Sequence, residues 1–455
     1  MRILSITAGA ANMFCGSCLR DNALARELIG RGHDVTLQPV YTPTLTDEEN
    51  VSSDRVLFGG VSVYLQQHVG MFRRTPWLLD KLWDSTAFLR LVSKRSIQVD
   101  PGGLGPLTIS TLQGERGFQR KEIDKLVAWL RDEPPYDVIN LPNALLIGLA
   151  EPIKRATGRP IVVTLQGEDL FLEGLRPADR DRALALIREQ VKHVDVFASV
   201  SEYYRGFMAD YVGIPAARIR VAPLGVSLRD LEPTSRTRSA TDPFVVGYFA
   251  RVAPEKSLHL LAEAYRILRQ ERGVPHARLE AAGYLAPEHR PYLQRIERQL
   301  QSWGLGDEFR YHGTLDRAAK VNFLRSIDVL SVPSTYKEPK GLYLLEAMAC
   351  GVPVVAPQLG AFPEMIAKTS GGLLARPDDA ASFADGLAAI HNNPTQARQI
   401  GLNGAAGVQQ HYSVARMADQ VLEVYSELVG GTPEPRRSPN ISHEGHEAHE
   451  AKKRS

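Results

Sequence analysis

Short apolar runs alternate with amphipathic stretches along the first half of the chain. An apolar run at Arg2–Thr7 is followed by a helix expected over 21–30 and a second strand within 32–37. Further elements of this half are strands expected at 137–141, 161–165 and 196–200 and a helix over 181–193. Apolar runs of this length, bounded by turn residues, are typical of buried strands. The order strand, helix, strand predicts right-handed βαβ units and a parallel sheet.

A second series of the same kind follows a polar stretch. Residues 228–241 are rich in Ser, Thr, Arg, Asp and Pro and have little apolar periodicity, so we interpret them as a linker. Strands are expected after it at 244–249, 277–282, 309–312, 329–332 and 352–356. The pattern therefore predicts two open α/β domains, 1–227 and 242–413, with a ligand cleft between them at the carboxyl ends of the strands.

The end of the chain divides into a helix and a polar tail. Apolar residues recur at helical spacing over 414–430, which predicts an amphipathic helix that could pack back on the N-terminal domain. Residues 431–455 are polar and contain few apolar side chains, so we expect them to be disordered.

Composition and length agree with a two-domain globular protein. At 455 residues the chain suits two domains of roughly 200 residues each. A net charge of +2 argues against a nucleic-acid binder, which usually concentrates basic charge. Only Cys15, Cys18 and Cys350 occur, too few for a disulfide framework, and no apolar run is long enough to span a bilayer. We therefore expect a cytoplasmic protein that begins with a buried strand rather than a signal peptide.

The segment from Glu338 to Pro357 carries the strongest chemical signal. Gly341 lets the backbone approach a ligand, and a helix is predicted over Leu342–Ala349. The helix N-terminus offers N–H groups and the positive end of a dipole, which suit a phosphate. The carboxylates of Glu338 and Glu346 can each accept two hydrogen bonds from neighbouring hydroxyls of a sugar or ribose. Taken alone, the pattern also fits two surface glutamates beside an ordinary helix.

This segment, with Glu-x7-Glu inside E-x-x-G-L-x-x-L-E-A-M-A-x-G-x-P-V-V-A, resembles the donor-site signature of the retaining family 4 glycosyltransferases. The resemblance extends over most of residues 1 to 430 and implies the GT-B fold, in which two Rossmann-like domains face each other across a cleft. It also implies that Glu338 contacts the transferred sugar and that Glu346 contacts the nucleotide ribose, with Gly341 and Leu342 at the phosphates. Lys340 stands where the family usually has an aromatic residue.

A second segment, Gly247 to Lys256, is similar to the family's strand followed by an arginine and a lysine. The resemblance implies that Arg251 and Lys256 hold the donor diphosphate, and it places Gly16 in the first loop, near donor phosphate and acceptor. As a nucleoside diphosphate leaves, negative charge develops on it, and two cations and a helix N-terminus can stabilise that charge. We therefore expect no metal and no other cofactor. Solvated loop charges are the alternative interpretation of Arg251 and Lys256.

One position that faces the acceptor departs from the family pattern. Gln166 occupies the place of a common family histidine. A glutamine can hydrogen-bond a sugar hydroxyl but cannot shuttle a proton. In the mechanism usually inferred for the family, the leaving phosphate accepts the proton of the acceptor, so this change is compatible with catalysis.

The function expected from these patterns is transfer of a hexosyl-type unit from a nucleotide-diphosphate sugar to a hydroxyl of a carbohydrate or lipid-linked acceptor, with retention of anomeric configuration. Two alternatives stay open. The missing histidine motivates a non-catalytic nucleotide-sugar-binding GT-B scaffold, and the GT-B fold also contains nucleotide-sugar epimerases. The nucleotide, the sugar and the acceptor are not specified by the sequence.

Four further signals receive modest interpretations. Cys15 and Cys18 have redox-motif spacing but lack a thioredoxin-like context, so we take them as loop cysteines, with redox or acceptor-site roles as alternatives. Asp179 and Asp181 are expected to cap a helix rather than to bind metal. The aromatic and basic segment 72–95 could contact the inner membrane face, shape an acceptor pocket, or pack on its own domain. The tail histidines 443, 446 and 449 are interpreted as solvated.

Overall fold

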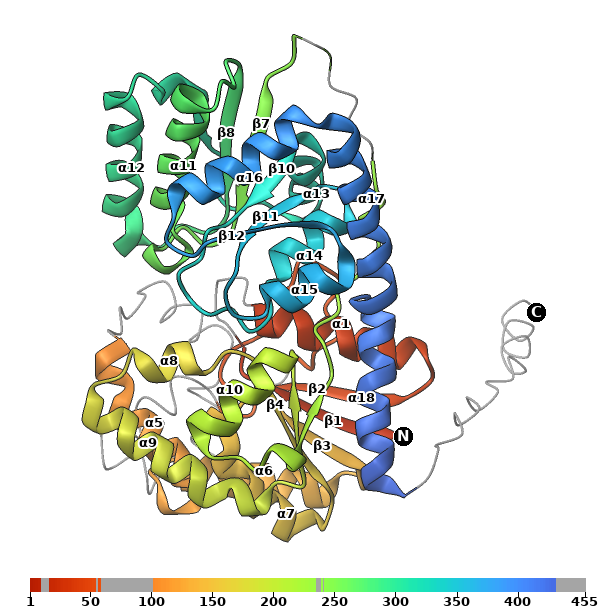
Figure 1. The fold of residues 1–455 in the computed structure, drawn as a ribbon. Helices are drawn as coiled ribbons and strands as arrows, with labels where there is room; N and C mark the ends of the chain where they lie inside the picture. Colours follow the sequence, from red (N-terminus) through yellow and green to blue (C-terminus); the bar gives the residue numbers. More distant parts are fainter. Residues whose placement is uncertain (10–15, 55, 59–100, 235–238, 240, 431–455) are drawn as a thin grey trace, which may run out of the picture.

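The computed structural model describes residues 1–9, 16–54, 56–58, 101–234, 239 and 241–430. The predictions that concern Cys15, the segment 72–95 and the tail 431–455 lie outside these residues. The described chain forms two α/β domains, each built on one six-stranded parallel sheet (Figure 1). This architecture confirms the GT-B arrangement of two Rossmann-like domains that the sequence predicts.

The N-terminal sheet has the strand order β2-β1-β3-β4-β5-β6, and every neighbouring pair is parallel. Its strands are β1 (Arg2–Thr7), β2 (Asp34–Pro39), β3 (Val138–Leu141), β4 (Ile161–Leu165), β5 (Val196–Ser199) and β6 (Ile219–Val221). Its helices are α1 (Gly16–Gly30), α5 (Gly105–Leu112), α6 (Arg120–Asp132), α7 (Ala150–Thr157), α8 (Asp169–Glu173), α9 (Pro177–Gln190) and α10 (Glu202–Val212).

Alternate residues of these strands enter two separate hydrophobic clusters. Val138 of β3 and Val162 of β4 belong to one cluster, and their neighbours Ile139 and Val163 belong to the other. Successive side chains of a strand point to opposite faces, so both faces of the sheet are covered. The central strands are accordingly buried along their whole length, which explains why they appear in the sequence as continuous apolar runs.

The C-terminal sheet has the order β12-β11-β10-β7-β8-β9, again all parallel. Its strands are β7 (Phe244–Phe249), β8 (Ala277–Ala282), β9 (Phe309–Tyr311), β10 (Val329–Ser331), β11 (Val354–Pro357) and β12 (Gly372–Ala375). Its helices are α11 (Leu258–Glu271), α12 (Arg290–Ser302), α13 (Arg317–Ser326), α14 (Leu342–Ala349), α15 (Phe362–Thr369), α16 (Ala380–Asn392) and α17 (Pro394–His411). The helices α14 and α15 lie on the side of this domain that faces α1 (Figure 1).

The last helix, α18 (Val414–Val429), returns from the C-terminal domain to the N-terminal one. It begins where Ser413 accepts a hydrogen bond from the backbone N–H of Arg416, and Gly430 ends it with a positive φ. Its apolar face, which includes Met417 and Val421, joins the same cluster as Ile3 and Leu28. Each such buried side chain contributes about 1.5–3 kcal/mol, so α18 is a structural part of the N-terminal domain.

Several expected elements differ from the structure. The first helix starts at Gly16 instead of residue 21, and β6 was not expected because it is only three residues long with an exposed Arg220. The edge strand β12 was not expected either, because Gly371 and Gly372 stand at its start and a pair of glycines is typical of a turn.

The expected helix caps at Asp179 and Asp181 are wrong. Helix α9 begins at Pro177, so Asp179 lies within its first turn, and Arg176 at the N-cap makes no side-chain capping bond. The proline itself starts the helix because its fixed φ suits the first helical position. Asp181 instead forms an exposed ion pair with Arg180.

Candidate active site

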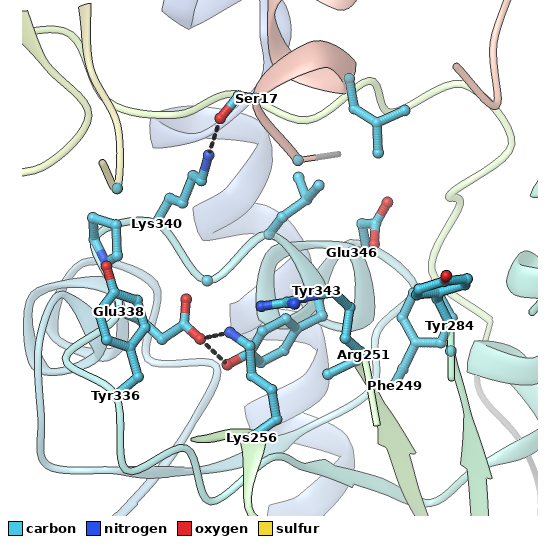
Figure 2. A pocket seen from close by; sticks show the side chains of 18 of the residues that line it. Ser17, Phe249, Arg251, Lys256, Tyr284, Tyr336, Glu338, Lys340, Tyr343 and Glu346 are labelled. Atoms are coloured by element: carbon cyan, nitrogen blue, oxygen red, sulfur yellow. Dashed lines mark hydrogen bonds and ion pairs between the residues drawn. The ribbon is translucent and has the colours of Figure 1, made fainter. Parts of the chain in front are cut away.

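A cavity of about 390 Å³ lies between the two domains. This volume falls in the range of small-ligand sites, about 300–1,000 Å³. The residues singled out in the sequence all line it, from both domains: Gly16, Gln166, Arg251, Lys256, Glu338, Lys340, Gly341, Leu342 and Glu346. Figure 2 shows several of their side chains converging on one space.

Lys256 and Glu338 form a buried ion pair at the floor of this cavity (Figure 2). Lys256 follows β7, and Glu338 lies between β10 and α14, so both come from segments at the carboxyl ends of strands. The hydroxyl of Tyr343 donates to Glu338 Oε1 at 3.4 Å. Burial, with the nearby guanidinium of Arg251, lowers the pKa of Lys256 to about 7. An arriving anion would favour the charged form of this lysine.

Gly341 directly precedes α14, and its backbone adopts the left-handed conformation, with φ +53°. A Cβ at this position would lie 2.6 Å from Cε1 of Phe362, so both the conformation and the space require glycine. Gly341, Leu342 and Tyr343 line the cavity, which places the N-terminal turn of the helix against it. The positive end of a helix dipole there suits a phosphate group.

Glu346 lies one turn further along α14 and is held by Lys320 of α13. The ammonium of Lys320 donates to Glu346 Oε1 at 2.6 Å and to Asp47 Oδ2 at 2.5 Å. All three side chains line the cavity and are largely buried. Burial lowers the pKa of Lys320, but the two carboxylates outweigh burial and raise it above its usual value. The bond from Lys320 therefore fixes the orientation of the Glu346 carboxylate.

Arg251 and Lys340 occupy more open positions. The side chain of Arg251 is 44% exposed and pairs with Glu255 at 3.0 Å. Lys340 crosses the cavity and donates to Ser17 Oγ of the N-terminal domain at 2.8 Å (Figure 2). Gly16 lies beside this contact, since a Cβ on it would be 3.9 Å from Lys340 Nζ. The lysine that replaces the family's aromatic residue is thus an interdomain contact.

Gln166 directly follows β4 and lines the cavity from the N-terminal domain. Its side-chain N–H donates to the carbonyl of Pro142 at 2.7 Å, and its backbone N–H donates to Glu168 at 2.8 Å. Glu168 also accepts hydrogen bonds from the backbone N–H groups of Gly167 and Ala144. Burial raises the pKa of Glu168. These bonds fix the loop that carries Gln166.

Several polar residues of the cleft were missed in the sequence, among them Asp47, Lys320 and Tyr336. Asp47 and Lys320 contact each other across the domains, and Tyr336 contacts Asp169 of the other domain. No local pattern marks such residues, because their partners are far away in the sequence.

Cysteine chemistry has little support among the described residues. Cys18 and Cys350 are both buried, and neither lines the cavity. Burial raises the pKa of the Cys350 thiol to about 11. Within the part of the chain that the structure describes, no group of three His, Cys, Asp or Glu side chains could hold a metal ion.

Two Rossmann-like domains that face each other across a ligand-sized cleft define the GT-B class. Anabaena HepE in complex with UDP shares this fold with a TM-score of 0.64 at 19% identity, over 94% of this chain and all of that one. Sucrose-phosphate synthase from Thermosynechococcus elongatus has a TM-score of 0.68 at 20% identity, over 94% of this chain and 98% of that one.

Family matches then define the chain more closely. Residues 233–406 match the family described as glycosyl transferases group 1, and residues 22–225 match the glycosyl transferase 4-like domain. The chain therefore belongs to the group 1, family 4 glycosyltransferases. A D-inositol 3-phosphate glycosyltransferase of Paenarthrobacter aurescens is 28% identical over half of this chain, and the match spans 57% of that relative. Among the described residues, no helix is long and apolar enough to cross a bilayer.

Proposed function

We propose that the protein transfers a hexosyl-type unit from a nucleotide-diphosphate sugar to an acceptor hydroxyl, with retention of anomeric configuration. The observation that carries this proposal is the convergence of Lys256, Glu338, the start of α14 and Glu346 in one cavity between the domains. These groups match the three parts of such a donor. Cations and helix N–H groups suit the diphosphate, and a carboxylate suits each set of vicinal hydroxyls.

In this proposal Arg251 and Lys256 stabilise the charge that develops on the departing nucleoside diphosphate. Glu338 orients the sugar and Glu346 binds the ribose. Gln166 faces the acceptor hydroxyl. The bond from the acceptor oxygen to the anomeric carbon forms as the bond from that carbon to the phosphate oxygen breaks, and the acceptor proton passes to the leaving phosphate.

Retention of anomeric configuration is supported by the lysine contacts of the carboxylates in the cavity. Glu338, Glu346 and Asp47, the carboxylates that line the described part of the cavity, are each held by a lysine. Each of these carboxylates already binds a lysine ammonium, so in this proposal the proton passes to the leaving phosphate. Charge stabilisation by lysine, arginine and helix N–H groups also makes a metal unnecessary in this proposal.

The acceptor is proposed more broadly, as a carbohydrate or lipid-linked hydroxyl compound. The Paenarthrobacter relative is named a D-inositol 3-phosphate glycosyltransferase, which makes a phosphorylated cyclitol one compound to test. We propose action in the cytoplasm, with the inner membrane face as the place where a lipid-linked acceptor would be met.

Turnover tests this function directly. Purified protein would be incubated with UDP-glucose, GDP-mannose or ADP-glucose, with and without D-inositol 3-phosphate, and with a chelator in parallel. We expect nucleoside diphosphate release from one donor that the chelator does not abolish, and an NMR coupling in the product that matches the donor's anomeric configuration. Nucleotide binding without release or transfer would instead favour the non-catalytic scaffold. An inverted product would contradict the proposed retention.

A further inference from the structure

Lys320 connects the cavity to the N-terminal domain through two carboxylates. Its ammonium binds Glu346 of its own domain and Asp47, which lies in the loop after β2 of the other domain. The side chains of Lys320, Glu346 and Asp47 are 6%, 9% and 12% exposed. Water screens charges that are this deeply buried only weakly. Each of the three charges therefore affects the position of the next.

A second ion pair lies beside this one but does not reach the cavity. Glu48, the neighbour of Asp47, accepts a hydrogen bond from Arg317 at 2.8 Å, one turn before Lys320 on α13. Glu48 also pairs with Arg26 of α1 at 3.3 Å. Both loop residues therefore hold the same helix to the N-terminal domain. Only Asp47 shares its cation with Glu346.

We infer that Asp47 is a positioning residue for the donor site, acting through Lys320 on Glu346. The inference rests on the proposed function, in which Glu346 binds the ribose. To accept hydrogen bonds from two vicinal hydroxyls, the carboxylate must be held in one plane. Lys320 does this by holding Oε1, and Asp47 keeps the ammonium of Lys320 in place from the opposite domain.

This arrangement links donor binding to the position of the N-terminal domain. When the Asp47 loop sits on α13, Glu346 is oriented for ribose, so the donor binds this arrangement more tightly. By linkage, a bound nucleotide stabilises the contact between Asp47 and Lys320 by the same factor. Asp47, a residue of the acceptor-side domain, thus influences nucleotide binding through Lys320.

The test compares Asp47→Asn with Glu48→Gln in the full-length protein. Both substitutions remove an ion pair between the same loop and the same helix, but only the first changes the surroundings of Glu346. Affinity for UDP, GDP and ADP would be measured by calorimetry, alongside donor KM and kcat for the sugar nucleotide that is turned over. We expect Asp47→Asn to weaken nucleotide binding and raise KM about five- to fiftyfold, with kcat nearly unchanged. Glu48→Gln should stay within about twofold of wild type.

Two further variants separate positioning from folding. Asp47→Glu keeps the carboxylate and should recover much of the affinity that Asp47→Asn loses. Lys320→Arg keeps a cation between the two carboxylates and should bind nucleotide better than Lys320→Met. Melting temperatures of the Asp47→Asn and Glu48→Gln proteins would show whether both are equally folded.

The inference is overturned if Asp47→Asn and Glu48→Gln change affinity equally, because general contact between the domains would then suffice. It is also overturned if Asp47→Asn binds as wild type does. If Glu346→Ala abolishes binding in that case, the proposed function survives and only the role of Asp47 fails. If wild type binds none of the three nucleotides, the proposed function and this inference fail together.

Discussion

The phenol of Tyr336 donates a hydrogen bond to Oδ1 of Asp169 at 2.8 Å, and this bond joins the two domains beside the cavity. Tyr204 of α10 donates to the same carboxylate oxygen at 2.8 Å. Tyr336 comes two residues before Glu338, so the bond connects the segment that carries Glu338 to the loop that carries Gln166.

Tyr336→Phe should lower kcat/KM and cost about 1 kcal/mol of unfolding free energy, because one donor to a shared carboxylate is lost while Tyr204 remains. Tyr211→Phe is a matched control, since that phenol binds Glu173 within one domain at 2.6 Å. Its kcat/KM should equal that of wild type. Equal kcat/KM values for Tyr336→Phe and wild type would exclude a role of this bond in the reaction.

Gly341→Ala should destabilise the protein by about 2–4 kcal/mol and weaken nucleotide binding. The new Cβ meets the ring of Phe362 and also sits on a backbone with positive φ. Gly273→Ala separates the two effects, since Gly273 has φ +71° and no atom within 4 Å of its Cβ position. That control should cost only about 1 kcal/mol. Denaturant unfolding of both variants measures the difference in unfolding free energy. Equal losses for Gly341→Ala and Gly273→Ala would show that the close approach to Phe362 does not contribute.

Arg251→Ala should weaken binding of nucleoside diphosphate about tenfold or more while leaving stability nearly unchanged. An exposed ion pair such as that with Glu255 contributes only about 0–1 kcal/mol to folding. Arg266→Ala is the control, because Arg266 forms a comparable exposed pair with Glu271 on α11 and does not line the cavity. Affinity for nucleoside diphosphate would be measured by calorimetric titration. Equal affinities of the two variants would contradict the proposed contact between Arg251 and the diphosphate.

Nucleotide affinity should fall as the pH rises from about 7.5 to about 9. The pKa of Lys256 in the free protein is lowered to about 7, so the lysine is increasingly neutral above that pH. A diphosphate favours the charged form and raises that pKa on binding, so binding must take up a proton. Terminal phosphates are already ionised in this range, with pKa about 6, and do not oppose the trend.

Calorimetry in two buffers of different ionisation enthalpy measures this proton uptake. Lys256→Met should bind more weakly at every pH and should lose the uptake. Affinity of wild type that stays constant over the range would contradict the lowered pKa of Lys256 or its contact with the diphosphate.

The sequence predicted the sheets well because buried parallel strands are continuous apolar runs. Both domains and the helix Leu342–Ala349 could be recognised, the helix from Gly341 before it and Gly351 after it. The edge strands β6 and β12 could not, because the exposed Arg220 interrupts β6 and a glycine pair typical of a turn stands at the start of β12.

The residues proposed to bind the donor were recognisable from local motifs, but the contacts across the cleft were not. Asp47 lies in a polar turn and Lys320 on an ordinary amphipathic helix, and nothing in either segment indicates that they meet. The same holds for Lys340, whose partner Ser17 belongs to the first helix of the other domain. Such contacts depend on how the two domains face each other.

The proposal that the cleft binds a nucleotide sugar is tested most directly by measuring the thermal shift of wild type and Glu346→Ala with UDP-, GDP- and ADP-sugars. A ligand that binds the folded state raises its stability by about 2.7 kcal/mol at one hundred times Kd. We expect the sugars of one nucleotide to raise the melting temperature of wild type and to have little effect on that of Glu346→Ala. Absence of a shift for wild type with every sugar nucleotide at millimolar concentration would contradict the assignment of the cleft as a donor site.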